Sequence, residues 1–176
     1  MRKPVLCLTG LVTLTLLLPE SLSSAEPPAG VFTRLAPLPA PKIIASAVAY
    51  PGGAYEPGNL TDGVARTEYS SEAKGTNTFV EFDFGVAVAV GGFRHVDRND
   101  PATVASSELV FTDAAGQVVA SVPVVHANTR RGVTFFALPA PVTAQRVRWR
   151  VTGLGPKGYG TVGGAEIGRA SCRERV

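Results

Sequence analysis

The chain has 176 residues, of which 45% are hydrophobic, and it carries a formal net charge of +3 with only two cysteines. Taking the five basic and three acidic residues of the two terminal segments described below from the totals of 17 and 14 leaves 12 and 11, a net charge of +1. With a balance so close to neutral, the basic charge of the whole chain says little about nucleic acid or an anionic membrane as partner, and we predict no nucleic-acid partner. Cys7 and Cys172 both lie in those terminal segments, so the domain between them is expected to hold together without a disulfide.

Residues 1–25 have the three parts of a secretory signal peptide. Arg2 and Lys3 form a basic tip, residues 5–18 are apolar, and small residues precede position 26. The apolar run is shorter than the roughly 20 residues that span a membrane. We therefore predict a secreted protein, extracellular or periplasmic, without an integral membrane segment after cleavage. A buried helix is the alternative, which Pro19 disfavours.

The segments on either side of the predicted domain differ from it in composition. Residues 26–41 are rich in Pro and Ala, which predicts a semi-rigid linker. Residues 166–176 have no apolar period and resemble the translation of a short-read sequencing adapter, so we expect a tail that is foreign to the domain. A basic tail that binds an acidic partner is the alternative. One domain is predicted over residues 42–165, large enough for a hydrophobic core, as the N-terminal part of a longer exported protein.

The domain has the pattern of an all-β protein. Residues 78–84 alternate apolar and polar side chains and end at Gly85. Within residues 146–151, the three apolar residues share one face of a strand and the three arginines share the other. Further strands are expected at residues 86–96, 107–112, 117–125, 132–138 and 144–151, with turns at 113–116 and 139–141. Short strands at regular spacing predict a β-sandwich or jelly roll.

The segment of residues 59–71 contains the most informative loop. Asp62 and Gly63 favour a tight turn in which the Asp62 carboxylate points inward, and Thr67 can add a hydroxyl and a carbonyl oxygen. A curled loop with only oxygen ligands suits calcium, which takes six to eight oxygens. An ordinary Asp-Gly turn is the alternative.

This loop resembles the signature of the discoidin-like, or coagulation-factor C-type, domains and of the related galactose-binding carbohydrate modules. Asp62, Gly63 and Thr67 match its first part, residues 80–85 match the strand that follows, and residues 165–167 match the closing motif. The resemblance covers residues 42–165. Tyr69 departs from it, because the family usually has Trp at this position.

The resemblance implies an all-β, single-domain jelly-roll β-sandwich of eight strands with one structural calcium ion. In the family, side chains and backbone carbonyls share the coordination of this ion. Carried over to this chain, the side-chain ligands are Asp62, Thr67 and Glu166, and the carbonyl ligands are Asn59, Val64, Thr67 and Ala165.

The resemblance also implies that a sugar binds at loops on one end of the sandwich, on an aromatic platform with polar groups around it. Residues 95–101 are dense in such polar groups. Arg98 is the first candidate, His95 and Asn99 are next, Tyr159 is the candidate platform, and Asn77 lies in a further loop. The alternative is structural: Arg98 pairs with a neighbouring aspartate and His95 is an ordinary residue of a strand end.

We find no catalytic motif in the sequence. Two histidines are too few for a histidine-rich metal site, and no nucleophile elbow, phosphate-binding glycine loop or zinc-spaced cysteine pair is present. Glu72, Glu81 and Asp83 could be considered as glycosidase carboxylates, but the last two alternate along one strand face. We therefore predict a monomeric carbohydrate-binding module that is not an enzyme. The alternatives are an adhesive module for protein or phospholipid, and an accessory domain of a hydrolase whose catalytic domain lies outside this sequence.

Overall fold

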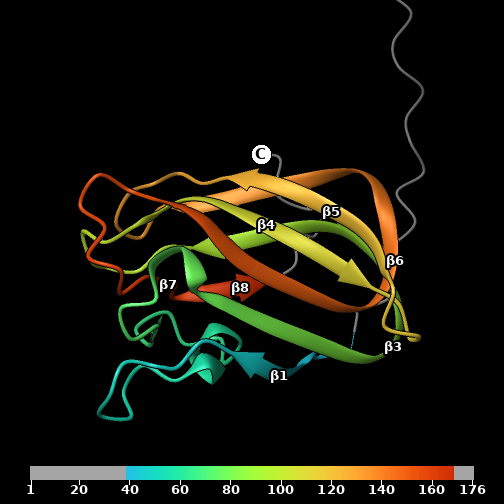
Figure 1. Ribbon diagram of the computed structural model, residues 1–176, viewed down its shortest axis with the longest axis horizontal. Coiled ribbons are helices and arrows are strands. Elements are labelled where there is room, and N and C mark those ends of the chain that lie inside the picture. Colours follow the sequence, from blue (N-terminus) through green and yellow to red (C-terminus); the bar gives the residue numbers. More distant parts are fainter. Residues whose placement is uncertain (1–38, 169–176) are drawn as a thin grey trace, which may run out of the picture. The chain divides into compact units, whose positions relative to one another are not determined.

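The computed structural model describes residues 39–168, which form eight strands and two short 3₁₀ helices (Figure 1). The predicted signal peptide, linker residues 26–38 and tail residues 169–176 lie outside this range. No helix within residues 39–168 is long and apolar enough to cross a membrane. The elements are β1 (Lys42–Ser46), η1 (Pro57–Leu60), β2 (Tyr69–Ser70), η2 (Gly75–Asn77), β3 (Phe79–Val96), β4 (Val104–Thr112), β5 (Val118–Val125), β6 (Val133–Leu154), β7 (Gly163–Gly164) and β8 (Glu166–Gly168).

Two long strands, β3 with 18 residues and β6 with 22, run through both layers of the sandwich. They pair antiparallel from Phe79 opposite Arg150 to Val96 opposite Val133. One half of this pair belongs to a five-stranded layer of order β1-β3-β6-β4-β5, and the other half forms a second layer with β8 (Figure 1). The layers face each other, since the rings of His95 and Trp149 stack with centroids 5.2 Å apart. The predicted all-β sandwich is confirmed.

The length of β3 and β6 differs from the prediction. Residues 78–84 and 86–96 were expected as two strands, as were 132–138 and 144–151, but each pair is one continuous strand. Gly85, which has a φ of 74°, and residues 139–141 lie where the pairing register shifts. The turn-forming residues at these positions therefore produce β-bulges, at which the strands bend and continue.

The fold extends beyond the predicted boundary at Ala165. Glu166 pairs with Val96, Ile167 with His95 and Gly168 with Arg94, so β8 is an edge strand of the second layer. Ile167 is half-buried and packs against the core. A strand of three residues is too short to show a period in the sequence, which explains why it was missed.

The core lies between the two layers, and Trp149, Tyr69 and Phe111 are its largest fully buried side chains. Tyr69, which stands where the resembled family has Trp, donates its hydroxyl to the Ala47 carbonyl at 2.8 Å. The aromatic exchange is accommodated because the buried hydroxyl has a partner.

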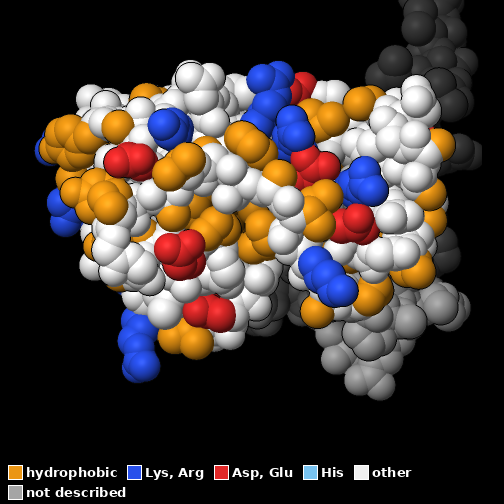
Figure 2. Space-filling view, turned by 60° about the horizontal axis from the view of Figure 1, so that its bottom comes forward, with side chains coloured by type: hydrophobic (Ala, Val, Ile, Leu, Met, Phe, Trp, Pro, Cys, Tyr) orange, Lys and Arg blue, Asp and Glu red, His pale blue; other side chains and the backbone are white. Residues whose placement is uncertain are grey.

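The outer face of the five-stranded layer carries the arginine stripe of β6. Its ion pairs join Arg146 to Asp83 at 3.1 Å, Arg148 to Glu81 at 2.6 Å, and Arg150 to Glu108. The space-filling view likewise shows basic and acidic side chains interleaved on the visible face (Figure 2). Since Glu81 and Asp83 are partners of arginines on one strand face, they serve the sheet as cross-strand pairs.

Candidate functional site

Loops from distant parts of the chain meet at one end of the sandwich (Figure 1, left). The Arg131 amide donates to the Arg98 carbonyl at 3.0 Å, and the Gly75 amide donates to the Gly160 carbonyl at 2.8 Å. The Gly155 amide donates to the Thr103 carbonyl at 2.8 Å, and the three bonds together join the residues that follow β3, β5 and β6 to those around η2. We call this surface the loop end; it comprises residues 50–56, 65–68, 72–77, 97–103, 127–132 and 155–161.

Arg98 is the anchored centre of the loop end. Its side chain is 8% exposed, and its Nε lies 3.3 Å from Glu68 Oε2. Its Nη1 donates to the Thr161 carbonyl at 2.5 Å, and its guanidinium carbon lies 5.4 Å from the centre of the Tyr55 ring. The partner is thus Glu68, from a loop 30 residues earlier, and neither of the neighbouring aspartates. Three contacts fix the guanidinium in one orientation.

One nitrogen of this guanidinium keeps access to solvent. Within residues 39–168, Arg98 Nη2 has no hydrogen-bond partner, and it is not among the fully buried atoms that lack one. Next to it, Asn99 is exposed, and its backbone amide donates to Glu68 Oε1 at 2.7 Å. Glu68 therefore positions two neighbouring groups, while a second cation, Arg131, lies 3.5 Å from it.

Further exposed rings and amides lie on the loops of this end. Tyr50 packs edge-on against Tyr55, with ring centroids 5.8 Å apart, and remains 44% exposed. Tyr159 is 66% exposed, on the loop that supplies the Thr161 carbonyl. Asn77 is exposed in η2, beside that loop. Four of the five predicted ligand residues, Arg98, Asn99, Tyr159 and Asn77, are thus at the same end of the sandwich.

His95 is the exception, and its predicted contact with ligand is wrong. The side chain is fully buried and stacks on Trp149. Its Nε2 lies 3.1 Å from the Gly163 carbonyl oxygen. Burial also lowers the pKa of His95 to about 3, so the ring is neutral. Alternation along β3 places this residue on the inner face, where no surface ligand reaches it.

Asp97 closes the loop after β3. Its carboxylate accepts the amides of Arg98 and Val104, each at 2.9 Å. Burial raises the pKa of this carboxyl to about 7, and the two amide bonds oppose the rise. Asp97 therefore shapes the base of the loop end instead of facing a ligand.

The sequence reasoning missed Glu68 and the ring pair Tyr50 and Tyr55. Glu68 directly follows the predicted calcium-binding loop, but no residue near it in the sequence indicates an ion pair with Arg98. Both tyrosines stand in a segment of Pro, Gly and Ala that shows only turn chemistry.

The predicted metal loop is curled as expected. Asp62 Oδ1 accepts the Val64 amide at 2.7 Å, and Gly63 has a φ of 72°, which favours glycine. Thr67 Oγ1 lies 2.7 Å from Asp62 Oδ2 and also 2.7 Å from the Val64 carbonyl oxygen. A hydroxyl has one proton to donate. Three oxygens therefore converge, but the single hydroxyl proton can form a hydrogen bond to only one of the other two. A hard cation would interact with the lone pairs of all three oxygens.

The remaining predicted metal ligands fit the ion less directly. Glu166 Oε2 lies 2.6 Å from Arg94 Nη1, so this carboxylate already has a cation as partner. Asn59 donates its side-chain amide to the carbonyls of Ala54 and Glu68 at 3.0 and 2.8 Å, which joins the two ends of this segment. Ala165 donates its amide to Val96. Within residues 39–168 no group of three or more His, Cys, Asp or Glu side chains is placed to hold a metal. A calcium site here would depend mainly on Asp62, Thr67 and backbone carbonyls.

No known protein-family model and no curated protein matches this sequence. Solved structures do match. Chitosan-binding module 1 of a chitosanase/glucanase from Paenibacillus sp. IK-5 has a TM-score of 0.57 at 17% identity, covering 74% of this chain and 94% of that one. A fucose-binding module from Streptococcus pneumoniae has a TM-score of 0.56 at 16% identity, covering 74% and 90%.

A third structure is the module CpGH89CBM32-5 from Clostridium perfringens, in complex with GalNAc-β-1,3-galactose. Its TM-score is 0.60 at 13% identity, and the alignment covers 74% of this chain and 96% of that one. At such identities the likeness concerns the fold. The chain has the β-sandwich fold that these modules share, which is the fold that the resemblance in its sequence predicted.

Proposed function

We propose that this protein is a carbohydrate-binding module and that the loop end is its sugar site. The observation that carries the proposal is the guanidinium of Arg98, held by Glu68 and the Thr161 carbonyl with Nη2 left free at a surface rich in tyrosine and asparagine. The structural neighbours support it, since their names state binding to chitosan, to fucose and to GalNAc-β-1,3-galactose.

The proposed mechanism is passive binding. The apolar C–H face of a pyranose ring stacks on an exposed tyrosine, Tyr159 or Tyr50, while its hydroxyls accept from Arg98 Nη2 and exchange hydrogen bonds with the Asn99 side chain. Because Glu68 already orients Arg98, little side-chain freedom is lost on binding. Asn77, exposed in η2 next to the loop of Tyr159, is a further candidate contact. Which sugar ring fits depends on the spacing of these groups and not on the fold.

We further propose that calcium binds in the loop of residues 59–67 as a structural ion. The convergence of Asp62, Val64 and Thr67 oxygens supports this, with Asn59 and Ala165 carbonyls as further candidate ligands. For Glu166 to join the shell, its carboxylate would have to be shared with Arg94. The ion would tie the turn to β2, which follows directly, and so stiffen the support of Glu68.

A binding role without catalysis fits the carboxylates that the sequence offers. Glu81 and Asp83 are paired with arginines, and Glu72 is exposed on the loop next to β2. Export of a monomeric protein through the signal peptide remains a prediction from the sequence.

Calorimetric titration with three sugars tests the function. Chitotriose, Lewis b and GalNAc-β-1,3-galactose are the probes, because structural neighbours are complexed with them. Saturable binding of any one supports a sugar site. Binding to none of them, or to a wider glycan array, together with binding to anionic liposomes would instead support the adhesive alternative.

A further inference from the structure

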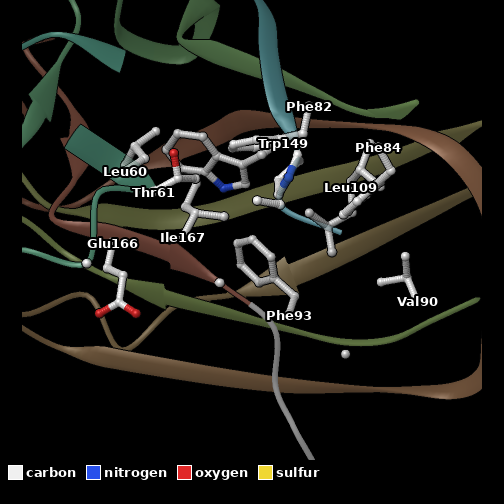
Figure 3. Close-up of a pocket in the computed structure, with 16 residues that line it drawn as sticks. Leu60, Thr61, Phe82, Phe84, Val90, Phe93, Leu109, Trp149, Glu166 and Ile167 are labelled. Atoms are coloured by element: carbon white, nitrogen blue, oxygen red, sulfur yellow. The ribbon is translucent and has the colours of Figure 1, made fainter. Parts of the chain in front are cut away.

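A cavity whose lining differs chemically from the loop end lies between the two layers. It has a volume of about 310 Å³ and is lined mainly by apolar side chains from β3, β4, β6, β8 and η1 (Figure 3). The side chains that matter below are Leu60, Phe82, Phe93, Leu109, Trp149 and Ile167. Polar groups stand at its rim, where Thr61 is exposed and the Glu166 carboxylate turns away from the rings toward Arg94 (Figure 3).

Trp149 places an unpaired donor in this apolar space. The residue is fully buried, and its Nε1 is the one buried side-chain nitrogen or oxygen within residues 39–168 without a hydrogen-bond partner. One face of the indole stacks on His95. The edge that carries the nitrogen faces the space between Ile167 and Phe93 (Figure 3). A buried N–H without a hydrogen-bond partner is costly and rare in folded proteins, so this donor needs an explanation.

We propose that this cavity binds a small uncharged molecule with an apolar body and a single acceptor oxygen, such as a ketone or an ester. The oxygen accepts the hydrogen bond from Trp149 Nε1, and the body fills the space between the phenylalanine rings. Ligand pockets begin at roughly 300 Å³, and an apolar cavity of about 150 Å³ already binds benzene, so a ring of six to eight carbon atoms fits.

The lining excludes the ligands proposed for the loop end. A sugar would bury several hydroxyls against Phe82, Phe93 and Leu109, which offer no partners. An anion would lose its hydration among the same apolar side chains, and Arg94 at the rim is already paired with Glu166. The ligand class is therefore distinct from carbohydrate, and this site does not depend on the proposed sugar function.

Trp149 also provides the probe, because it is the only tryptophan in the sequence. In ¹⁵N-labelled protein the single indole N–H resonance is titrated with cyclohexanone and, separately, with methylenecyclohexane, which has the same shape without the acceptor. We expect a saturable downfield proton shift with the ketone. The alkene should saturate the same site without the downfield shift, since it accepts no comparable hydrogen bond.

Two variants locate the binding. Val90→Phe fills the cavity from β3 and should remove the response to both probes, whereas Val125→Phe, at a position 81% exposed on β5, should leave it unchanged. Trp149→Phe removes the donor, so its affinities are followed by saturation-transfer NMR of the probes. We expect the affinity for the ketone to fall about tenfold relative to that for the alkene, which is the contribution of one hydrogen bond. Loop-end sugar binding should be unaffected by Val90→Phe.

The proposal is overturned if the indole resonance shows no saturable shift with cyclohexanone, or if both probes shift it alike. An unchanged response in a folded Val90→Phe protein would also overturn it, because binding would then lie elsewhere. The comparison of the two probes on the unaltered protein decides the question even if Trp149→Phe does not fold.

Discussion

The Nδ1 atoms of His95 and His126 lie 3.2 Å apart in the core, with the two rings perpendicular. His95 Nε2 lies against the Gly163 carbonyl, which can only accept, so His95 carries its proton on Nε2. Its Nδ1 must then accept from His126 Nδ1. His126 Nε2, 2.7 Å from the Ser107 hydroxyl, accepts in turn from that hydroxyl. The four groups form one directed chain of hydrogen bonds in which both histidines are neutral.

Acid should therefore destabilise the fold through this pair. Burial lowers the pKa of His95 to about 3 and that of His126 to about 4, whereas the unfolded value is about 6.5. Below that value the unfolded chain binds protons that the folded chain does not, so stability falls as pH decreases. Between pH 7.5 and 5 each histidine contributes a loss on the order of 2 kcal/mol. Urea unfolding at the two pH values measures the net change in stability, in which Asp97 partly offsets the loss from the two histidines.

Asp97 acts in the opposite direction and provides the control. Its pKa is raised to about 7, so as pH falls the folded state binds a proton at Asp97 before the unfolded state does. The contribution of Asp97 to stability therefore increases toward acid. His126→Gln should flatten the loss of stability toward acid, and Asp97→Asn should steepen it. Parallel pH profiles for the unaltered protein and both variants would contradict the neutral histidine pair.

Substitutions of exposed residues at the loop end should affect sugar binding without affecting the stability of the fold. Asn99→Ala and Tyr159→Ala should each weaken sugar binding by about tenfold, the loss of one good contact, with an unchanged melting temperature, because both side chains are exposed. Calorimetry on the best sugar probe measures the first, and thermal unfolding the second. Full affinity in both variants would remove these residues from the site.

Arg98→Ala should weaken sugar binding and also destabilise the protein, in contrast to a surface residue. It leaves Glu68, 12% exposed, with the Asn99 amide and Arg131, at 3.5 Å, as its remaining partners, and a buried carboxylate that loses its closer cation costs about 3 kcal/mol. Arg148→Ala is the matched control, since its pair with Glu81 is more exposed and worth less than about 1 kcal/mol. Equal melting temperatures for the two variants would show that the Arg98 pair is not a structural anchor.

Calcium should raise the melting temperature if the Asp62 loop binds it. At a concentration 100 times the Kd, the folded state gains about 2.7 kcal/mol, which corresponds to several degrees. Differential scanning fluorimetry in calcium and in chelator measures the difference, and Asp62→Ala should abolish it. Asp113→Ala is the control, because Asp113 holds a comparable turn by accepting the Gln117 amide at 2.8 Å. Equal melting temperatures of the unaltered protein in both buffers would refute the calcium site.

Gly163 should be intolerant of a side chain. A Cβ at this position would lie 2.1 Å from the Tyr69 carbonyl oxygen, on the paired strand β2. Since backbone cannot move aside cheaply, Gly163→Ala should cost about 3 kcal/mol or more. Gly91→Ala is the control, with nothing within 4 Å of the added carbon. Urea unfolding compares the two, and a stable Gly163→Ala protein would contradict the close β2–β7 pairing.

The sequence by itself determined the all-β class, the inward faces of the strands and the curl of the Asp62 loop. Val147, Trp149 and Val151 alternate within six residues, and the Asp62-to-Thr67 contacts span five, so both follow from local geometry. Such signals depend only on residues that are neighbours in the chain.

Only the tertiary structure decided that Gly85 bends β3 instead of ending it, that Glu68 holds Arg98, and that His95 lies in the core. It also decided that Trp149 faces a cavity. Each of these depends on how β3 and β6 cross from one layer to the other, which sets contacts between residues 30 or more positions apart. Because burial and ion pairing are properties of that three-dimensional neighbourhood, no local pattern of residues specifies them.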